Sequence, residues 1–253
     1  MTERKPGAWS YSGIKTYETC PLKYCAEKVT KEIPFTDTEA TIYGKELHSA
    51  AEEFIRDGKP LDPRFGWMLP TLERLNHIEG EKFCELKMGI KKVDGRLEAC
   101  DFFDPKVWMR GIADLVIVNG SVGYCCDYKT GKSSRYADSR QLALMAACMF
   151  LKFPELQKIK ASLLFVVAGD LVKSEYTRDN AFDIFAELHG LLTQREASYS
   201  NDVWNARPNG LCGKYCQVTR CEHNGSRRWL GIRVTTRKIG NERRRGRKRI
   251  LMS

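Results

Sequence analysis

The chain has 253 residues, of which 42 are lysine or arginine and 32 are aspartate or glutamate, so its net charge is +10. This length fits one large domain or a domain with an appendage, and the 29% of charged and 42% of hydrophobic residues exclude a wholly disordered or collagen-like chain. No apolar run approaches the roughly 18–20 residues that cross a bilayer, and the start lacks the apolar segment of a secretory signal. We therefore expect a cytoplasmic protein without a membrane partner, in which most of the ten cysteines are ordinary buried thiols.

The first seventy residues predict helices. Ser10 or Ser12 could cap a first helix, and Thr38 precedes apolar residues at helical spacing that Gly58 would end. Three prolines follow between positions 59 and 70 and predict a loop.

The middle of the chain predicts a β-hairpin. Two apolar runs, residues 111–118 and 122–130, flank Asn119-Gly120, a pair typical of a tight turn. The later segments read as helix, strand and helix over residues 139–151, 161–168 and a stretch that begins at Asp179 or Asn180. With a weakly alternating strand near residues 82–90, this order predicts an α/β fold with a central mixed β-sheet flanked by helices.

The excess positive charge lies in one segment at the end of the chain. Residues 226–253 contain eleven lysine or arginine residues and one glutamate, which leaves residues 1–225 without net charge. Such a block predicts a flexible basic arm that binds a polyanion in a salt-dependent way. The residues expected to contact nucleic acid are Arg243, Arg244, Arg245, Arg247, Lys248 and Arg249.

Asp114 lies inside an apolar strand, where an unpaired carboxylate would cost several kcal/mol. The hairpin places Asp127 and Lys129 on the same face as Asp114, because side chains alternate along a strand. A two-residue loop puts Cys125 opposite Asp114, and a four-residue loop over residues 119–122 puts Asp127 there.

Two carboxylates at this distance repel each other unless a cation lies between them, and their oxygens suit Mg²⁺ or Mn²⁺. Near such a metal, Lys129 could orient or deprotonate a water, or stabilise charge on a phosphate. This grouping predicts metal-assisted phosphodiester hydrolysis, with a structural aspartate–lysine pair as the alternative.

These segments resemble a known family. Residues 111–114 (GIAD) and 127–131 (DYKTG) are similar to the core motifs of the PD-(D/E)XK nuclease superfamily, in particular its RecB-like branch. Residues 44–48 (GKELH) resemble the upstream helix motif of that branch, and Gln141 resembles its glutamine on the helix after the hairpin. The resemblance covers about residues 9–150 and implies a restriction-endonuclease-like core.

The resemblance also implies roles for single residues. The implied catalytic residues are Asp114, Asp127, Lys129 and Gln141, and the implied ligands of Mg²⁺ or Mn²⁺ are His48, Asp114, Asp127 and the carbonyl of Tyr128. Lys129 would serve the attacking water, and Gln141 would position DNA or that water. Glu85 is a further acidic residue that could lie near the site, and Met145 stands where the branch often carries a tyrosine.

Four cysteines form a second group. Cys212, Cys216 and Cys221 lie within ten residues, and Cys20 precedes a proline near the start. They are similar to the one N-terminal and three C-terminal cysteines that hold a [4Fe–4S] cluster in some RecB-like nucleases, including the AddB and CRISPR-adaptation types, although the middle C-terminal cysteine is displaced by one position. A zinc site built from three cysteines and His223 fits nearly as well, and binding no metal is the third alternative.

The sequence therefore predicts a nuclease domain over residues 1–225 that cleaves DNA with Mg²⁺ or Mn²⁺, as an exonuclease more readily than as an endonuclease. Cleavage is expected to need no ATP, because the chain carries no complete P-loop. The resemblance favours phage or bacterial DNA recombination or processing, in the cytoplasm of a bacterium or a phage-infected cell, with recombination or replication proteins as candidate partners. The alternatives are a noncatalytic nucleic-acid-binding protein with a degenerate nuclease fold and an interaction module built on the cysteines.

Overall fold

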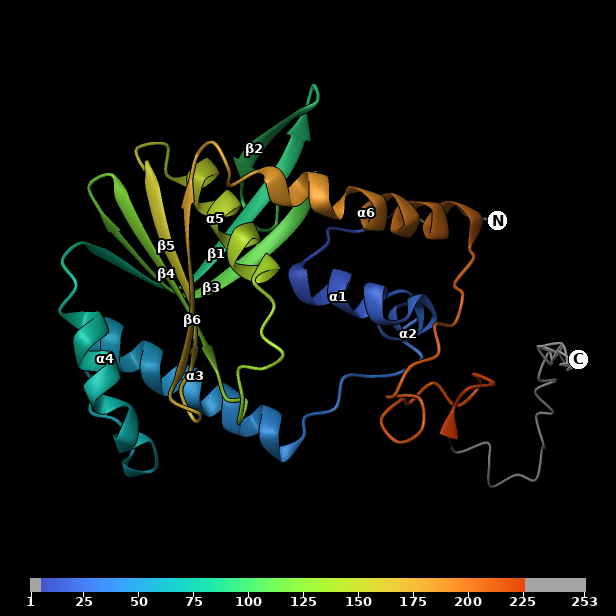
Figure 1. Cartoon of the computed structure of the whole chain (residues 1–253), viewed down its shortest axis with the longest axis horizontal. Helices are drawn as coiled ribbons and strands as arrows, with labels where there is room; N and C mark the ends of the chain where they lie inside the picture. The colour runs from blue at the N-terminus through green and yellow to red at the C-terminus, as the bar shows by residue number, and fades with distance from the viewer. Residues whose placement is uncertain (1–5, 226–253) are drawn as a thin grey trace, which may run out of the picture. The chain divides into compact units, whose positions relative to one another are not determined.

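The computed structural model describes residues 6–225 (Figure 1). The chain divides into two compact units, Met1–Arg207 and Pro208–Ser253. The predicted basic arm and its six nucleic-acid contacts lie outside the described residues, so the boundary expected after residue 225 stays a prediction.

A six-stranded mixed sheet forms the centre of the first unit. In spatial order its strands are β2 (Arg96–Cys100), β1 (Glu81–Val93), β3 (Val107–Asn119), β4 (Val122–Lys129), β5 (Lys158–Phe165) and β6 (Asp170–Thr177). Strands β4 and β5 run parallel, and every other neighbouring pair is antiparallel. A parallel pair needs a long crossover, and a helix supplies it between β4 and β5.

Helices cover both faces of this sheet (Figure 1). The helical elements are α1 (Tyr11–Thr19), α2 (Pro21–Tyr24), the π-helix η1 (Cys25–Val29), α3 (Glu39–Asp57), the 3₁₀ helix η2 (Pro63–Met68), α4 (Leu69–Asn76), α5 (Arg140–Lys152) and α6 (Asp183–Asn201). Leu142, Phe150 and Leu188 from α5 and α6 are buried on one face, and Leu47 and Leu72 from α3 and α4 on the other. Each such side chain stabilises the fold by about 1.5–3 kcal/mol. The predicted mixed sheet flanked by helices is confirmed.

The hairpin of β3 and β4 takes the second of the two predicted registers. Asn119 pairs with Val122 around Gly120-Ser121, and the ladder ends where Leu115 pairs with Cys126. The turn is therefore one residue later than Asn119-Gly120, and Gly120 supplies the positive φ (55°) that the turn needs. One further step of this register would place Asp114 opposite Asp127.

Two expectations about local structure were wrong. Residues 59–70, expected as a loop, contain η2 and the start of α4, because Pro63 and Pro70 each occupy a first helical turn, where a missing N–H costs nothing. Strands β2 and β6 were not expected; both are edge strands, and β6 has an exposed, alternating pattern. Among the helices of residues 6–225, none combines the length and the apolar character that a bilayer crossing requires.

A charged network holds α1 against the start of α5. Arg140 donates to both carboxylate oxygens of Glu18, at 2.9 and 2.7 Å, and also pairs with Asp138. Lys15 adds a hydrogen bond to Asp138 at 2.9 Å. The hydrogen bonds from Arg140 are the main reason why the pKa values of Glu18 and Asp138 lie below their usual range. The network fixes α1 beside the helix that carries Gln141.

Candidate metal and active site

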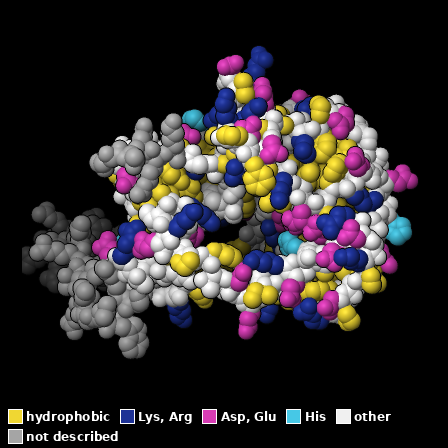
Figure 2. Space-filling view, turned by 180° about the vertical axis from the view of Figure 1, so that it is seen from behind, with side chains coloured by type: hydrophobic (Ala, Val, Ile, Leu, Met, Phe, Trp, Pro, Cys, Tyr) yellow, Lys and Arg dark blue, Asp and Glu magenta, His cyan; other side chains and the backbone are white. Residues whose placement is uncertain are grey.

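Six side chains from five elements meet near the end of β4. We call them the site residues: His48 (α3), Glu85 (β1), Asp114 (β3), Asp127 and Lys129 (β4), and Gln141 (α5). The sequence predicted five of them as site residues, and Glu85 only as a further acidic residue nearby. Figure 2 shows a face of the molecule that is hollowed near its middle, with a histidine and acidic side chains gathered beside the hollow.

His48 bridges the two central strands. Its Nε2 lies 3.0 Å from the carbonyl oxygen of Tyr128, and its Nδ1 lies 3.2 Å from Oδ1 of Asp114. A Cβ atom at Gly44, one helical turn earlier, would lie 3.7 Å from Oγ1 of Thr130, an ordinary van der Waals contact. The histidine of the GKELH segment therefore contacts both strands from α3.

Asp127 is held by the two residues predicted to assist it. Its Oδ1 accepts a hydrogen bond from Nε2 of Gln141 at 2.6 Å, and its Oδ2 lies 2.5 Å from Nζ of Lys129. The side chain is 8% exposed, so both contacts act in a largely water-excluded environment. The amide and the ammonium group thus fix the orientation of this carboxylate.

Asp114 has a second contact besides His48. Its Oδ2 accepts a hydrogen bond from the backbone N–H of Tyr128 at 2.5 Å. This bond follows directly after the point where the β3–β4 ladder ends, so a side chain replaces the backbone partner there. Asp114 therefore joins the two strands while it presents Oδ1 to the site.

Glu85 occupies a distorted position of β1. The residues on either side pair with β3, Cys84 with Leu115 and Leu86 with Ala113, which leaves Glu85 opposite Asp114. Its φ of 49° is in the left-handed region, which a residue with a Cβ adopts at a cost and which is frequent at functional sites. The only signal for Glu85 in the sequence was an acidic residue within an expected strand. The backbone distortion that directs its side chain toward the site has no signal in the sequence.

The carboxylates of the site carry an excess of negative charge. Burial and the charge of Asp114 raise the pKa of Asp127, although Lys129 opposes this shift. Burial and the charge of Asp114 also raise the pKa of Glu85. Burial alone would lower the pKa of His48, but its hydrogen bond with Asp114 and the nearby carboxylates raise it overall. Each of these pKa shifts reflects the excess of negative charge among the carboxylates, which a bound cation would reduce.

The donor set fits a hard divalent cation. Atoms of His48, Glu85 and Asp114 lie within 4.8 Å of one another, and they form the one such group of three or more among residues 6–225. Carboxylate and carbonyl oxygens with a single imidazole suit Mg²⁺ or Mn²⁺ better than thiolate-preferring metals. The carbonyl oxygen of Tyr128 lies 3.0 Å from Nε2 of His48, whereas Asp127 is not a member of this group, so its assignment as a metal ligand stays a prediction.

Met145, at the position where the resemblance to the RecB-like branch led us to expect a tyrosine, belongs to the core. Met145 is 5% exposed and packs against Gly111, where a Cβ atom would lie only 3.3 Å from the Met145 sulfur. The glycine of the GIAD segment thus leaves room for α5 to approach β3.

The cysteines of the second unit lie within a short, tightly bonded segment. The N–H of Gly225 donates to the carbonyl of Cys212 at 2.9 Å, and Nδ2 of Asn224 donates to the carbonyl of Cys216 at 2.8 Å, while Cys221 is buried. In the described part of this unit, the cysteines and His223 do not form a group of three ligand atoms at metal-binding distance. The assignment of Cys20, Cys212, Cys216 and Cys221 to a [4Fe–4S] cluster, or to zinc, stays a prediction.

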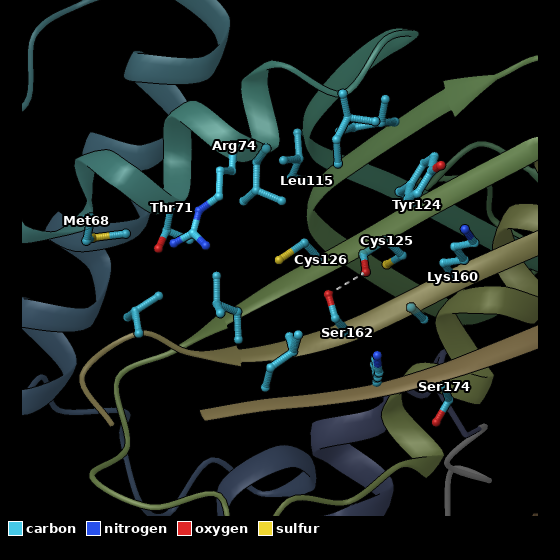
Figure 3. Close-up of a pocket in the computed structure, with 18 of the residues that line it drawn as sticks. Met68, Thr71, Arg74, Leu115, Tyr124, Cys125, Cys126, Lys160, Ser162 and Ser174 are labelled. Carbon is cyan, nitrogen blue, oxygen red and sulfur yellow. Dashed lines mark hydrogen bonds between the residues drawn. The ribbon is translucent and has the colours of Figure 1, made fainter. Parts of the chain in front are cut away.

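A separate cavity of about 780 Å³ lies between α4 and the sheet (Figure 3). Thr71 and Arg74 line it from the helix, and Lys160 and Ser162 line it from β5. The hydroxyl of Ser162 donates to the carbonyl of Cys125 at 3.3 Å. Since no site residue lines this cavity, the proposed chemistry does not take place in it.

Comparisons with known proteins bear on the family and on the fold of this chain. A family model described as the PD-(D/E)XK nuclease superfamily matches residues 8–221. A crystal structure of a candidate exonuclease from Eubacterium rectale is similar, with a TM-score of 0.52 and 13% identity over 85% of this chain and 88% of that one. The crystal structure of the protein SSO0001 has a TM-score of 0.47 and 14% identity, over 87% of this chain and 89% of that one. No curated protein sequence matches the chain.

Proposed function

Because the chain belongs to the PD-(D/E)XK nuclease superfamily, we propose that it is a metal-dependent deoxyribonuclease that hydrolyses phosphodiester bonds. The observation that carries the proposal is the meeting of two buried carboxylates, Asp114 and Asp127, with Lys129 and the imidazole of His48. A noncatalytic protein with a degenerate site would have no need to keep this costly cluster of charges.

Each site residue has a task that follows from its contacts. His48, Glu85, Asp114 and Asp127 would hold Mg²⁺ or Mn²⁺ together with the carbonyl of Tyr128. The bound metal would polarise the phosphate and lower the pKa of a coordinated water. Lys129, as the cationic partner of Asp127, is placed to orient a water and to stabilise charge on a phosphate oxygen. Gln141 keeps the Asp127 carboxylate in place through its amide N–H.

We propose exonuclease rather than endonuclease action, without ATP, in recombination or processing of phage or bacterial DNA. The mode of action is supported by the fold shared with a candidate exonuclease and by the resemblance of the motifs to RecB-like enzymes. The pathway is supported by that resemblance alone.

The first test is degradation of linear duplex, closed circular and single-stranded DNA with Mg²⁺ or Mn²⁺, beside the same reactions in EDTA. We expect loss of linear DNA that EDTA prevents, and survival of the closed circles, because an exonuclease needs an end. Cleavage of circles would identify an endonuclease. Absence of cleavage with DNA binding intact would favour the noncatalytic alternative.

The distorted residue Glu85 provides a second test. Glu85→Gln keeps the shape of the side chain but removes its charge, so the Mg²⁺ concentration for half-maximal cleavage should rise by about 10-fold or more. The matched control is Glu81→Gln, an exposed position at the start of the same strand, which should leave that concentration unchanged. An unchanged metal requirement in Glu85→Gln would remove this residue from the metal site.

A further inference from the structure

A cavity of about 530 Å³ opens beside Lys129 and Gln141. It lies along one edge of β3, between the end of the β4 ladder at Leu115 and the point where the N-terminal segment bridges to Met109. Between these two points, no described strand pairs with residues 111–114 on this side. The missing strand leaves space for a ligand that reaches the catalytic lysine.

Arg110 brings a second cation to this cavity. Its Nε is buried without a hydrogen bond, and within residues 6–225 its guanidinium has no hydrogen-bonding or ion-pairing partner. The group lies over the ring of Phe102, 5.2 Å from the ring centre, and the backbone N–H of Arg110 donates to the carbonyl of Trp9 at 2.8 Å. A half-buried guanidinium without an acceptor is costly, and an anion in the cavity would supply the acceptor.

The remaining lining also favours an anion. No aspartate or glutamate lines the cavity, whereas Lys129 and Arg110 both do. The first turn of α1 faces it with Ser10, which caps the helix through Gly13, and with Ser12, whose hydroxyl lies 3.2 Å from that of Ser10. A helix N-terminus and the serine hydroxyl that does not donate within this pair add to the attraction of the two cations. The combination suits a phosphate group.

We propose that Arg110 binds a non-bridging oxygen of the phosphate next to the one that is cleaved, and so positions the DNA strand. The proposal rests on the proposed nuclease function. In this proposal one phosphate of the strand lies at Lys129 and the next lies at Arg110, because both residues line one cavity. The planar fork of an arginine binds phosphate oxygens in pairs, which a lysine does not do.

The test uses DNA of the form that is cleaved, with one neutral methylphosphonate linkage moved stepwise along the strand. Affinity is measured in EDTA for the wild type, for Arg110→Gln and for the control Arg96→Gln, an exposed arginine of β2. At one position along the strand, the methylphosphonate should weaken DNA binding by the wild type by about 10-fold or more, because a charge-assisted hydrogen bond is lost there. Arg110→Gln should bind unmodified DNA as weakly as the wild type binds DNA with that linkage, and the linkage should reduce its affinity little further. Arg96→Gln should behave as the wild type.

An Arg110→Gln protein with the wild-type sensitivity at every linkage would overturn the proposal, even if it cleaves DNA. The proposal would also be overturned if no position of the methylphosphonate weakened DNA binding by the wild type, and this outcome does not depend on any variant. If Arg110→Gln melts at a lower temperature, Arg110→Lys replaces it; that variant keeps the charge and should show an intermediate loss. Failure of the nuclease proposal is recognised separately, by the cleavage assay with unmodified DNA and metal.

Discussion

Asp127→Asn is expected to abolish cleavage, by about 10³-fold or more, while it stabilises the metal-free protein. Activity is lost because an amide is a poor ligand for a hard cation and leaves Lys129 without its ionic partner. Stability increases because burial and the charge of Asp114 raise the pKa of Asp127 in the folded state. A carboxyl group with a raised pKa weakens the folded state at every pH where it is ionised there, so a neutral side chain removes that cost.

The melting temperature in EDTA measures this effect. At neutral pH, Asp127→Asn should melt a few degrees above the wild type, and the difference should shrink as the pH falls toward the ordinary carboxyl range, where Asp127 takes up its proton. Asp179→Asn, an exposed carboxylate in a turn, should change neither cleavage nor melting. A lower melting temperature in Asp127→Asn would mean that the carboxylate supports the fold rather than the chemistry.

Lys129→Met should also reduce cleavage, by about 10²- to 10³-fold, but with the opposite effect on stability. The ammonium group lies 2.5 Å from Asp127 and lowers the pKa of that carboxyl, so its loss leaves the repulsion between Asp114 and Asp127 uncompensated. The metal-free variant should therefore melt below the wild type at neutral pH. Lys129→Arg, which keeps the charge, should retain most of the stability while losing activity, since a fork-shaped group does not reproduce the ammonium contacts.

The double variant Asp127→Asn with Lys129→Met separates the two effects. If repulsion between the carboxylates is the cause, the destabilisation by Lys129→Met should disappear once Asp127 is neutral. Equal destabilisation by Lys129→Met in both backgrounds would contradict this account and assign the effect to packing of the lysine side chain.

The sequence was sufficient for the hairpin of β3 and β4. The two candidate loops differ in length by two residues. Either register therefore predicts that Asp114, Asp127 and Lys129 lie on one face of the sheet. The choice between the registers depends on whether Asn119 enters the strand, and in the structure Asn119 pairs with Val122.

Other parts of the site needed the folded structure. Nothing in the periodicity of α3 brings His48 to a strand 80 residues later, and only the family resemblance predicted that meeting. Glu85 reaches the site because its own backbone is in the left-handed region within β1. Glutamate has no preference for that region, so the sequence did not indicate it. The role of Arg110 was missed because it depends on the cavity beside residues 111–114, where no described strand pairs with β3 on this side, and the sequence carries no signal for that.

The hydrogen bond from the Tyr128 N–H to Asp114 bears on how the site can change during evolution. Position 127 can lose its charge while its oxygen still accepts from Gln141, so the fold tolerates the change. Position 114 has to keep an acceptor, because a buried N–H of the adjoining strand depends on it. We therefore expect inactive descendants of this chain to lose the carboxylate at position 127 first and to keep Asp or Asn at position 114.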